Sequence, residues 1–235
     1  MNASRTAGTL LVAVPLIFTA GFTGLQTTFE YPDILRQPAG DVLTRFAAAG
    51  ADLHLYWYAM MAASLLMIGA VTAAGLHFWK RDSFLAALSI GAGVLAGLVQ
   101  ALGLLRWVML VPSLAAMYVA PGATEIEQSM AIALFDAANH YLGMGVGEHL
   151  GYLFTAIWTA LASAMIYKSN SILAVAGVVI AVGVISGMLE PFGVPMTGVI
   201  NSISYTLWAL WTLILGVVLL RGERSVATHA IAHLA

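Results

Sequence analysis

Six long apolar segments constrain the fold of this 235-residue chain more than any other feature of its sequence. A helix needs about 20 apolar residues to cross the hydrocarbon core of a bilayer, and each segment is close to or above that length. Strands of alternating hydrophobicity, which a membrane barrel would need, are absent from the sequence. The sequence therefore predicts an all-α integral membrane protein, with a six-transmembrane-helix bundle that forms a single domain over residues 1–235. We place the spans at residues 8–26, 53–79, 83–111, 146–167, 172–189 and 199–220.

The composition agrees with a chain that lies largely in lipid. Charged residues make up 9% of the sequence, against roughly 25% in a soluble domain. Membrane lipid is therefore the partner that we expect for most of its surface. The net charge of −2 argues against a nucleic-acid partner. Because the chain has no cysteine, disulfides, thiolate metal sites and a cysteine nucleophile are excluded.

Proline and amphipathic patterns mark where the chain leaves the membrane. Residues 41–46 follow a break at Pro38, and residues 130–139 are half apolar and half polar. We expect two short interfacial helices there, both on the outer face. Pro112 is expected to kink or end the third span, and Pro191 to end the fifth.

The first apolar segment has two interpretations. Arg5, an apolar run and the small residues at 19–21 also fit a secretory signal peptide. Because Pro15 and the extended run resemble the later spans, we favour a helix that is not cleaved.

Basic residues predict the orientation. If the chain crosses the membrane six times, six basic residues lie on one side of the membrane, and Arg36 and Arg45 lie on the other side. The positive-inside rule then places both termini in the cytoplasm. The six are Arg5, Lys80, Arg81, Lys168, Arg221 and Arg224.

Polar residues of the last four spans share one depth. Counting 1.5 Å per residue from the cytoplasmic ends places them about 24–35 Å away, just under the outer surface. Charged groups at such depths usually face the bundle and pair, so we expect Arg106 to pair with Glu148 or Glu190 rather than to extend to the headgroups. The ligand-binding residues of this candidate outward-facing pocket are Gln100, Arg106, Trp107, His140, Glu148, His149, Tyr152, Glu190, Asn201 and Tyr205.

The segment from Asn139 to Tyr152 is the richest in groups that could carry chemistry. On an α-helix Glu148 and Tyr152 share a face, whereas His149 lies about 100° away from Glu148. His54 and His77 stand at opposite ends of the second span, but His77 has no histidine partner at its own depth. No paired-ligand spacing such as H-E-x-x-H occurs, so we expect no cofactor and no metal. The glycines at 143, 145 and 147 are interpreted as close helix packing.

Four segments carry a resemblance that extends over nearly the whole chain. They are residues 29–36, 97–107, 147–152 and 189–191, which read FEYPDILR, GLVQALGLLRW, GEHLGY and LEP. In this order they resemble a family of bacterial multi-pass membrane proteins, domain of unknown function 4386. The resemblance implies a bacterial inner-membrane protein of about this size, and it implies no activity and no catalytic residue.

Three classes of function follow from the polar layer. We favour the binding of a small amphipathic or lipid-like molecule, with Arg106 holding an anionic head and Trp57, Trp107 and Met130 forming an apolar wall. One alternative is a membrane-embedded enzyme, with Glu148 or Glu190 as base and His140 or His149 as acid, or with metal chemistry at the outer face. The others are a transporter, disfavoured because the inner half lacks polar groups, and a helper subunit of a larger complex.

Overall fold

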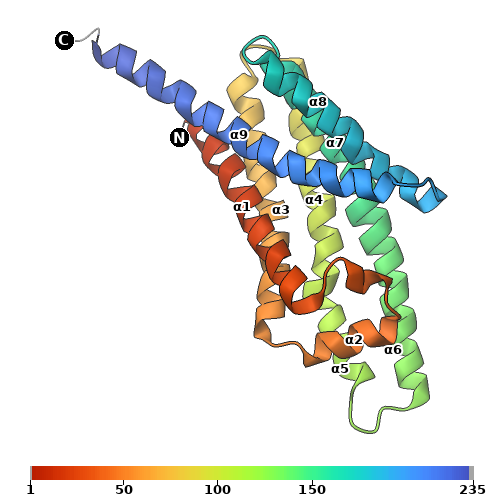
Figure 1. The fold of residues 1–235 in the computed structure, drawn as a ribbon. Coiled ribbons are helices and arrows are strands. Elements are labelled where there is room, and N and C mark those ends of the chain that lie inside the picture. Colours follow the sequence, from red (N-terminus) through yellow and green to blue (C-terminus); the bar gives the residue numbers. More distant parts are fainter. Residues whose placement is uncertain (1, 233–235) are drawn as a thin grey trace. The chain divides into compact units, whose positions relative to one another are not determined.

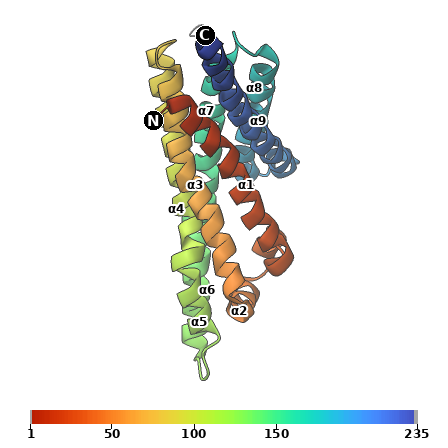
Figure 2. The same cartoon turned by 90° about the vertical axis from the view of Figure 1, so that its left-hand side faces the viewer.

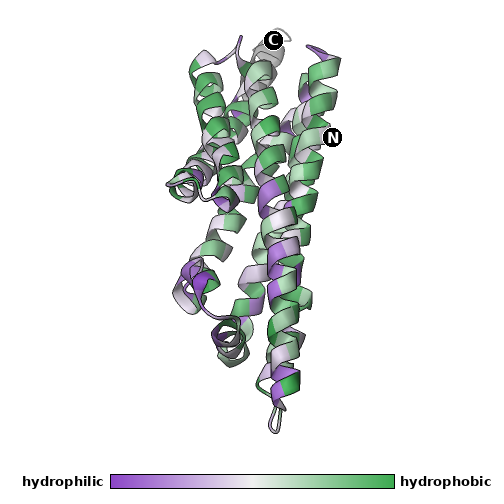
Figure 3. Ribbon diagram, turned by 90° about the vertical axis from the view of Figure 1, so that its right-hand side faces the viewer, coloured by the Kyte–Doolittle hydropathy of each residue, from purple (hydrophilic) through white to green (hydrophobic). Residues whose placement is uncertain are grey.

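The protein is helical throughout the part of the chain that the structure, a computed structural model, describes. It describes residues 2–232, with side chains up to residue 222, so Arg224, which counted toward the orientation, lies outside the described side chains. Within these limits there is no strand, and six helices are long and apolar enough to cross a membrane. The chain is therefore a multi-pass membrane protein. The predicted fold class is confirmed, and most residues of the long helices are apolar (Figure 3).

Twelve helical elements follow one another between residues 3 and 232 (Figure 1). The helices α1 to α5 are Ala3–Phe29, Ala39–Ala48, Ala51–Phe78, Ser83–Met109 and Val111–Tyr118. The helices α6 to α9 are Glu125–Ala138, Gly151–Ile166, Ser171–Ile185 and Thr197–Ala232. Two 3-10 helices, η1 and η3, cover Asp33–Arg36 and Ser186–Phe192, and a π-helix, η2, covers Asn139–Leu150.

These elements group into two compact units. The single domain that the sequence predicts over residues 1–235 stays a prediction. Unit 1 comprises residues 1–16, 65–98 and 149–235, and unit 2 comprises residues 17–64 and 99–148. Helices α1, α3 and α4 each contribute residues to both units.

Unit 2 has an aromatic core covered by the short helix α2. Helix α2 packs on α5 and α6, and it buries Val42, Leu43 and Phe46 (Figure 1). Glu30 follows α1 with a left-handed φ of 53°, and its carboxylate pairs with the Arg45 guanidinium at 2.7 Å. This ion pair ties the end of α1 to α2.

Unit 1 is built around α7, α8 and α9, which lie next to one another (Figure 2). The Asn170 side chain caps α8 by accepting a hydrogen bond from the Leu173 N–H at 3.0 Å. Gly177 lets α8 approach Ser163 and Trp211, because a Cβ there would overlap both side chains. The outer face of α8 exposes Ile172, Val179 and Val182, as expected of a lipid-facing helix.

Two boundaries differ from the sequence prediction. The amphipathic segment near 130–139 is α6, but it continues without a turn through η2 into α7, so this apolar helix runs over Glu125–Ile166. No proline or turn sequence interrupts it, and the glycines stay helical. Helix α8 ends at Ile185, and η3 carries the chain past Pro191 before Gly193 turns it with a φ of 72°.

The other predicted breaks are confirmed. The segment at 41–46 lies in α2, and Pro112 falls in the first turn of α5, directly after α4 ends. Proline suits a first helical turn because its missing N–H is not needed there.

Candidate functional site

The π-helix η2 is the local feature on which the candidate site of unit 2 is built. Its backbone touches α4 at a pair of glycines: a Cβ on Gly103 would lie 2.6 Å from the Gly147 Cα, and 3.0 Å from the Leu142 carbonyl oxygen. Helices this close require glycine on both sides. The packing role predicted for the glycines of this segment is thus confirmed at Gly147.

Arg106 fills the space that a second glycine leaves open. A Cβ on Gly143 would lie 2.6 Å from the Arg106 Nη2. That nitrogen donates to the Asn139 Oδ1 at 3.0 Å, and Nη1 donates to the Gly103 carbonyl oxygen. The Arg106 Nε has no partner among the described residues. Arg106 is 8% exposed, so its inward orientation, which the sequence predicts, is confirmed.

The π-helical geometry explains why Asn139 and Glu148 act on the same guanidinium. Nine residues separate them, which is about two and a half turns of an α-helix and would place them on opposite faces. With hydrogen bonds from residue i to i+5, a π-helix takes nearly one more residue per turn, so nine residues make about two turns. Both side chains then face Arg106, and the Glu148 carboxylate is close enough to interact electrostatically with it.

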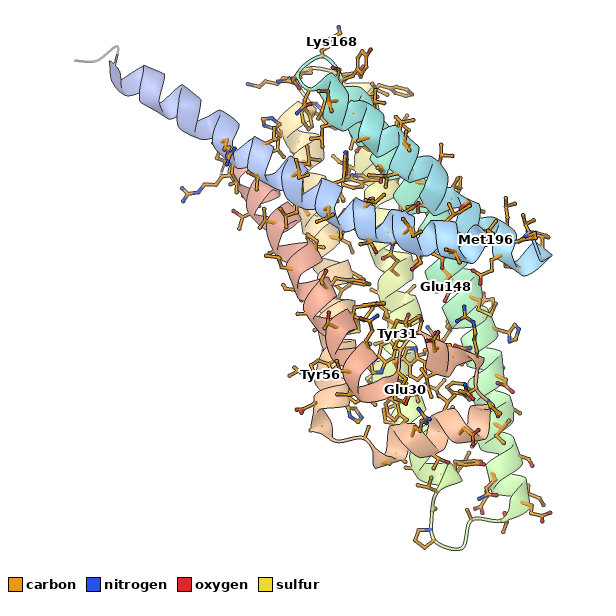
Figure 4. All side chains as sticks on the ribbon, in the orientation of Figure 1. Glu30, Tyr31, Tyr56, Glu148, Lys168 and Met196 are labelled. Atoms are coloured by element: carbon orange, nitrogen blue, oxygen red, sulfur yellow. The ribbon has the colours of Figure 1, made fainter. Side chains whose placement is uncertain are left out.

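Tyr31 completes this group from the connection between α1 and η1. Burial, and to a smaller extent the negative charge of Glu148, raise the pKa of the Tyr31 hydroxyl to about 12, against the opposing effect of the positive charge of Arg106. Tyr31 therefore stays protonated at neutral pH and can donate a hydrogen bond. Figure 4 shows Tyr31 in this connection and Glu148 on η2.

An aromatic stack lies next to the Arg106 group. The rings of Trp57 and Trp107 are parallel within 2° at 4.5 Å, and the Arg106 guanidinium lies 5.4 Å from the Trp107 ring. Phe46 stacks on Trp107 at 6.1 Å and packs edge-on against His54 at 5.2 Å. Both indoles are buried, so these rings belong to the core of unit 2.

A cavity of about 540 Å³ opens beside this stack in unit 2. Its walls are alanine, valine, proline and phenylalanine side chains from α2, α5 and the segments that follow them, and His54 is its one ionisable lining residue. Phe46 forms part of the wall and also stacks on Trp107, so the Phe46 and Trp107 rings connect the cavity wall to Arg106. The lining residues are Phe46, Ala47, Ala49, His54, Pro112, Ala115, Ala116, Val119, Ala120 and Pro121.

The ten residues predicted for one pocket are divided equally between the units. Gln100, Arg106, Trp107, His140 and Glu148 belong to unit 2, where Gln100 is half-buried and His140 is exposed. His149, Tyr152, Glu190, Asn201 and Tyr205 belong to unit 1. A single pocket formed by all ten stays a prediction.

The predicted residues of unit 1 have their own environment. Asn201 is buried and donates to the Val184 carbonyl oxygen at 2.6 Å, and the Tyr152 and Tyr205 rings lie 5.6 Å apart. Glu190 is exposed, and its carboxylate lies beside Gly198.

Three contributors to the Arg106 group were not predicted. Asn139 and Gly143 are in the segment that the sequence analysis singled out, but α-helical spacing does not bring them together with Glu148. Tyr31 lies in one of the segments that carry the family resemblance, and its long-range position had no local signal.

The chemistry of the group is that of a buried charge with hydrogen-bonding neighbours. Arginine, glutamate, asparagine and tyrosine can hold an anion or orient a polar head. Among the described residues, no set of three histidine, aspartate or glutamate side chains is placed to bind a metal ion.

Comparisons with known proteins give one match. No curated protein and no solved structure matches the chain. The model of the family described as Domain of unknown function (DUF4386) matches residues 6–222, which is nearly the whole chain. The chain belongs to this family, as its four sequence segments indicate.

Proposed function

We propose that this protein is a multi-pass protein of the bacterial inner membrane that binds a small amphipathic, lipid-like molecule in the unit 2 cavity. The observation that carries the proposal is a cavity of about 540 Å³ with apolar walls and a single ionisable group, His54. Ligand sites of roughly 300–1,000 Å³ with mostly apolar walls and a few fixed polar groups suit small molecules.

The polarity of the walls determines the kind of ligand. Alanine, valine and proline walls bind an alkyl chain through burial, worth about 25 cal/mol per Å² of apolar surface. His54 offers a hydrogen-bonding group for the polar end of the ligand, and its ring is held against Phe46. An amphiphile with one chain matches this arrangement.

We assign Arg106 a positioning role, in which it supports the wall of the cavity and does not contact the anionic head of the ligand. Its two terminal nitrogens are bonded to Asn139 and to the Gly103 carbonyl group, and Trp107 lies over the guanidinium. The guanidinium therefore supports Trp107, and through it the Phe46 wall of the cavity.

The proposed orientation places both termini in the cytoplasm, and hence the Pro121 end of the cavity on the outside. The excess of basic residues in the opposite loops supports it. A periplasm-active reporter inserted near Ala123, between α5 and α6, should be active, and the same reporter fused to the C-terminus should be silent. The reverse pattern would place the cavity on the cytoplasmic side.

The ligand is tested with radiolabelled oleate and purified protein in nanodiscs. Wild-type protein should bind oleate saturably, at about one per chain. Ala116 is exposed and lines the cavity, so Ala116→Trp should fill it and weaken binding by at least about tenfold. Ala137 on α6 is also exposed but outside the lining, so Ala137→Trp is a matched control and should bind as the wild type does. Equal binding by both variants, or no saturable binding, would refute the proposal.

A further inference from the structure

Unit 1 contains a cavity that is larger than the cavity of unit 2, and it lies at the end of unit 1 that carries basic residues. It has a volume of about 710 Å³, and it is bordered by the start of α1, the end of α3, the turn between α7 and α8, and α9. Its inner wall is apolar, with leucine, isoleucine, valine and phenylalanine side chains from four helices. Its polar lining residues are Asn2, Ser4, His77, Arg81, Ser169 and Asn170.

The charge at this cavity has one sign. Arg81 and His77 are basic, and none of the lining residues is acidic. The Arg81 guanidinium lies 5.4 Å from the Phe78 ring, and it makes no ion pair or hydrogen bond with another described side chain. The adjacent Asp82 carboxylate instead accepts the Leu85 N–H at 2.9 Å.

The first turn of α8 adds to this positive field. Asn170 lines the cavity and is also the residue that caps α8, a helix of 15 residues. The N-terminus of a helix carries a partial positive charge that favours anions. An anionic group in the cavity would therefore meet a guanidinium, an imidazole and a helix N-terminus.

The surroundings indicate that this anion is attached to a lipid. Trp79 and Tyr167 are 44% and 58% exposed at this end of the unit, as expected of aromatic residues at the boundary between lipid and water. Lys168, in the turn after α7, lies at the same end of unit 1 but outside the cavity lining (Figure 4). A soluble phosphate would leave the apolar wall uncovered, whereas a phospholipid covers it with its glycerol and the first carbons of its chains.

We propose that this cavity binds the phosphate headgroup of an anionic membrane lipid, with Arg81 as its main cationic contact. The site lies in unit 1 and is independent of the amphiphile site proposed for unit 2. Arg81 binds the phosphate through charge-assisted hydrogen bonds, and Asn170 and Ser169 provide polar neighbours.

Native mass spectrometry of the full chain, released from detergent with defined lipids, tests this site. Wild-type protein should retain phosphatidylglycerol at least about tenfold more than phosphatidylcholine, which carries a compensating positive charge. Arg81→Gln should abolish this preference. Val218→Trp, from the apolar wall on α9, should fill the cavity and remove the bound lipid.

Lys168→Gln is the matched control, because it removes one positive charge at the same end from a residue outside the lining. It should keep the preference for phosphatidylglycerol. Inorganic phosphate in excess should not displace the lipid. Displacement by phosphate would show a site for free anions, and an unchanged preference in both Arg81→Gln and Val218→Trp would show that the lipid binds elsewhere; either result would overturn the proposal.

Discussion

Both units bury polar groups among apolar helices, but they do so with different chemistry. In unit 1 the buried polar side chains are neutral: Thr159 donates to the Thr155 carbonyl oxygen one turn earlier, and the Trp211 indole donates to the Leu173 carbonyl oxygen. In unit 2 the buried polar side chain of greatest consequence is the Arg106 guanidinium, the one charged group that is buried among the described side chains.

The difference shows what each kind of group requires of the backbone. A hydroxyl or an indole needs only one acceptor, which a neighbouring turn or helix offers to Thr159 and Trp211. A guanidinium has five N–H groups and a charge, so it needs several acceptors from different elements. Unit 2 supplies them from α4 and η2, and the π-helical geometry of η2 brings Asn139 and Glu148 to one face.

The strongest test of this contrast between the units removes the Arg106 charge and the Glu148 charge in separate variants. Arg106 is buried, and the half-buried Glu148 interacts with it electrostatically. Removal of the partner of a buried charge typically costs up to about 3–5 kcal/mol, because the remaining charge is left without compensation. Arg106→Gln and Glu148→Gln should each lower the Tm in detergent clearly. The double variant should recover part of the loss, and the Tm values of the three variants measure the coupling.

Glu190→Gln provides the matched control for this cycle. Glu190 is the other partner that the sequence allowed, and it is exposed. Alone it should change stability by no more than about 0.5 kcal/mol, as surface substitutions usually do. If the Tm losses of Arg106→Gln and Glu148→Gln were additive, and those of Arg106→Gln and Glu190→Gln were not, then Glu190 and not Glu148 of η2 would be the partner of Arg106.

Much of this architecture could be predicted, because hydropathy reports it directly. The six apolar segments, the break at Pro112 and the amphipathic α2 follow from local patterns that the bilayer and the proline ring impose. The inward orientation of Arg106 followed from its depth.

The partners of Arg106 could not be predicted in the same way. Periodicity arguments assume 3.6 residues per turn, and η2 departs from it as its backbone packs against α4 at Gly103 and Gly147. That contact joins residues 44 positions apart, and Tyr31 is still more distant from Arg106 in sequence. Pairings of this kind depend on tertiary packing, which no single segment encodes.

A second prediction sharpens the comparison within one helix, since α4 contributes glycines to both units. Gly103→Ala should destabilise the protein by about 1–3 kcal/mol, because its Cβ would overlap the Gly147 backbone and η2 would have to move. Gly91, in unit 1, has open space around it, so Gly91→Ala should stabilise α4 by about 0.5–1 kcal/mol. In thermal denaturation, the Tm should fall for Gly103→Ala and rise for Gly91→Ala. A change in the same direction for both variants would contradict the close approach of Gly103 to Gly147.

The smallest expected effect concerns the neutral groups of unit 1. The Trp208 indole donates to the Thr159 hydroxyl oxygen at 2.8 Å, and Thr159 keeps its own bond to Thr155 without it. Trp208→Phe should therefore cost only about 0.5–1.5 kcal/mol, the usual value of one hydrogen bond, and Trp79→Phe at an exposed position should cost less. Both are read as changes in Tm. A loss in Trp208→Phe as large as that in Arg106→Gln would mean that neutral groups in unit 1 form a network as demanding as the buried charge, and the contrast between the units would fail.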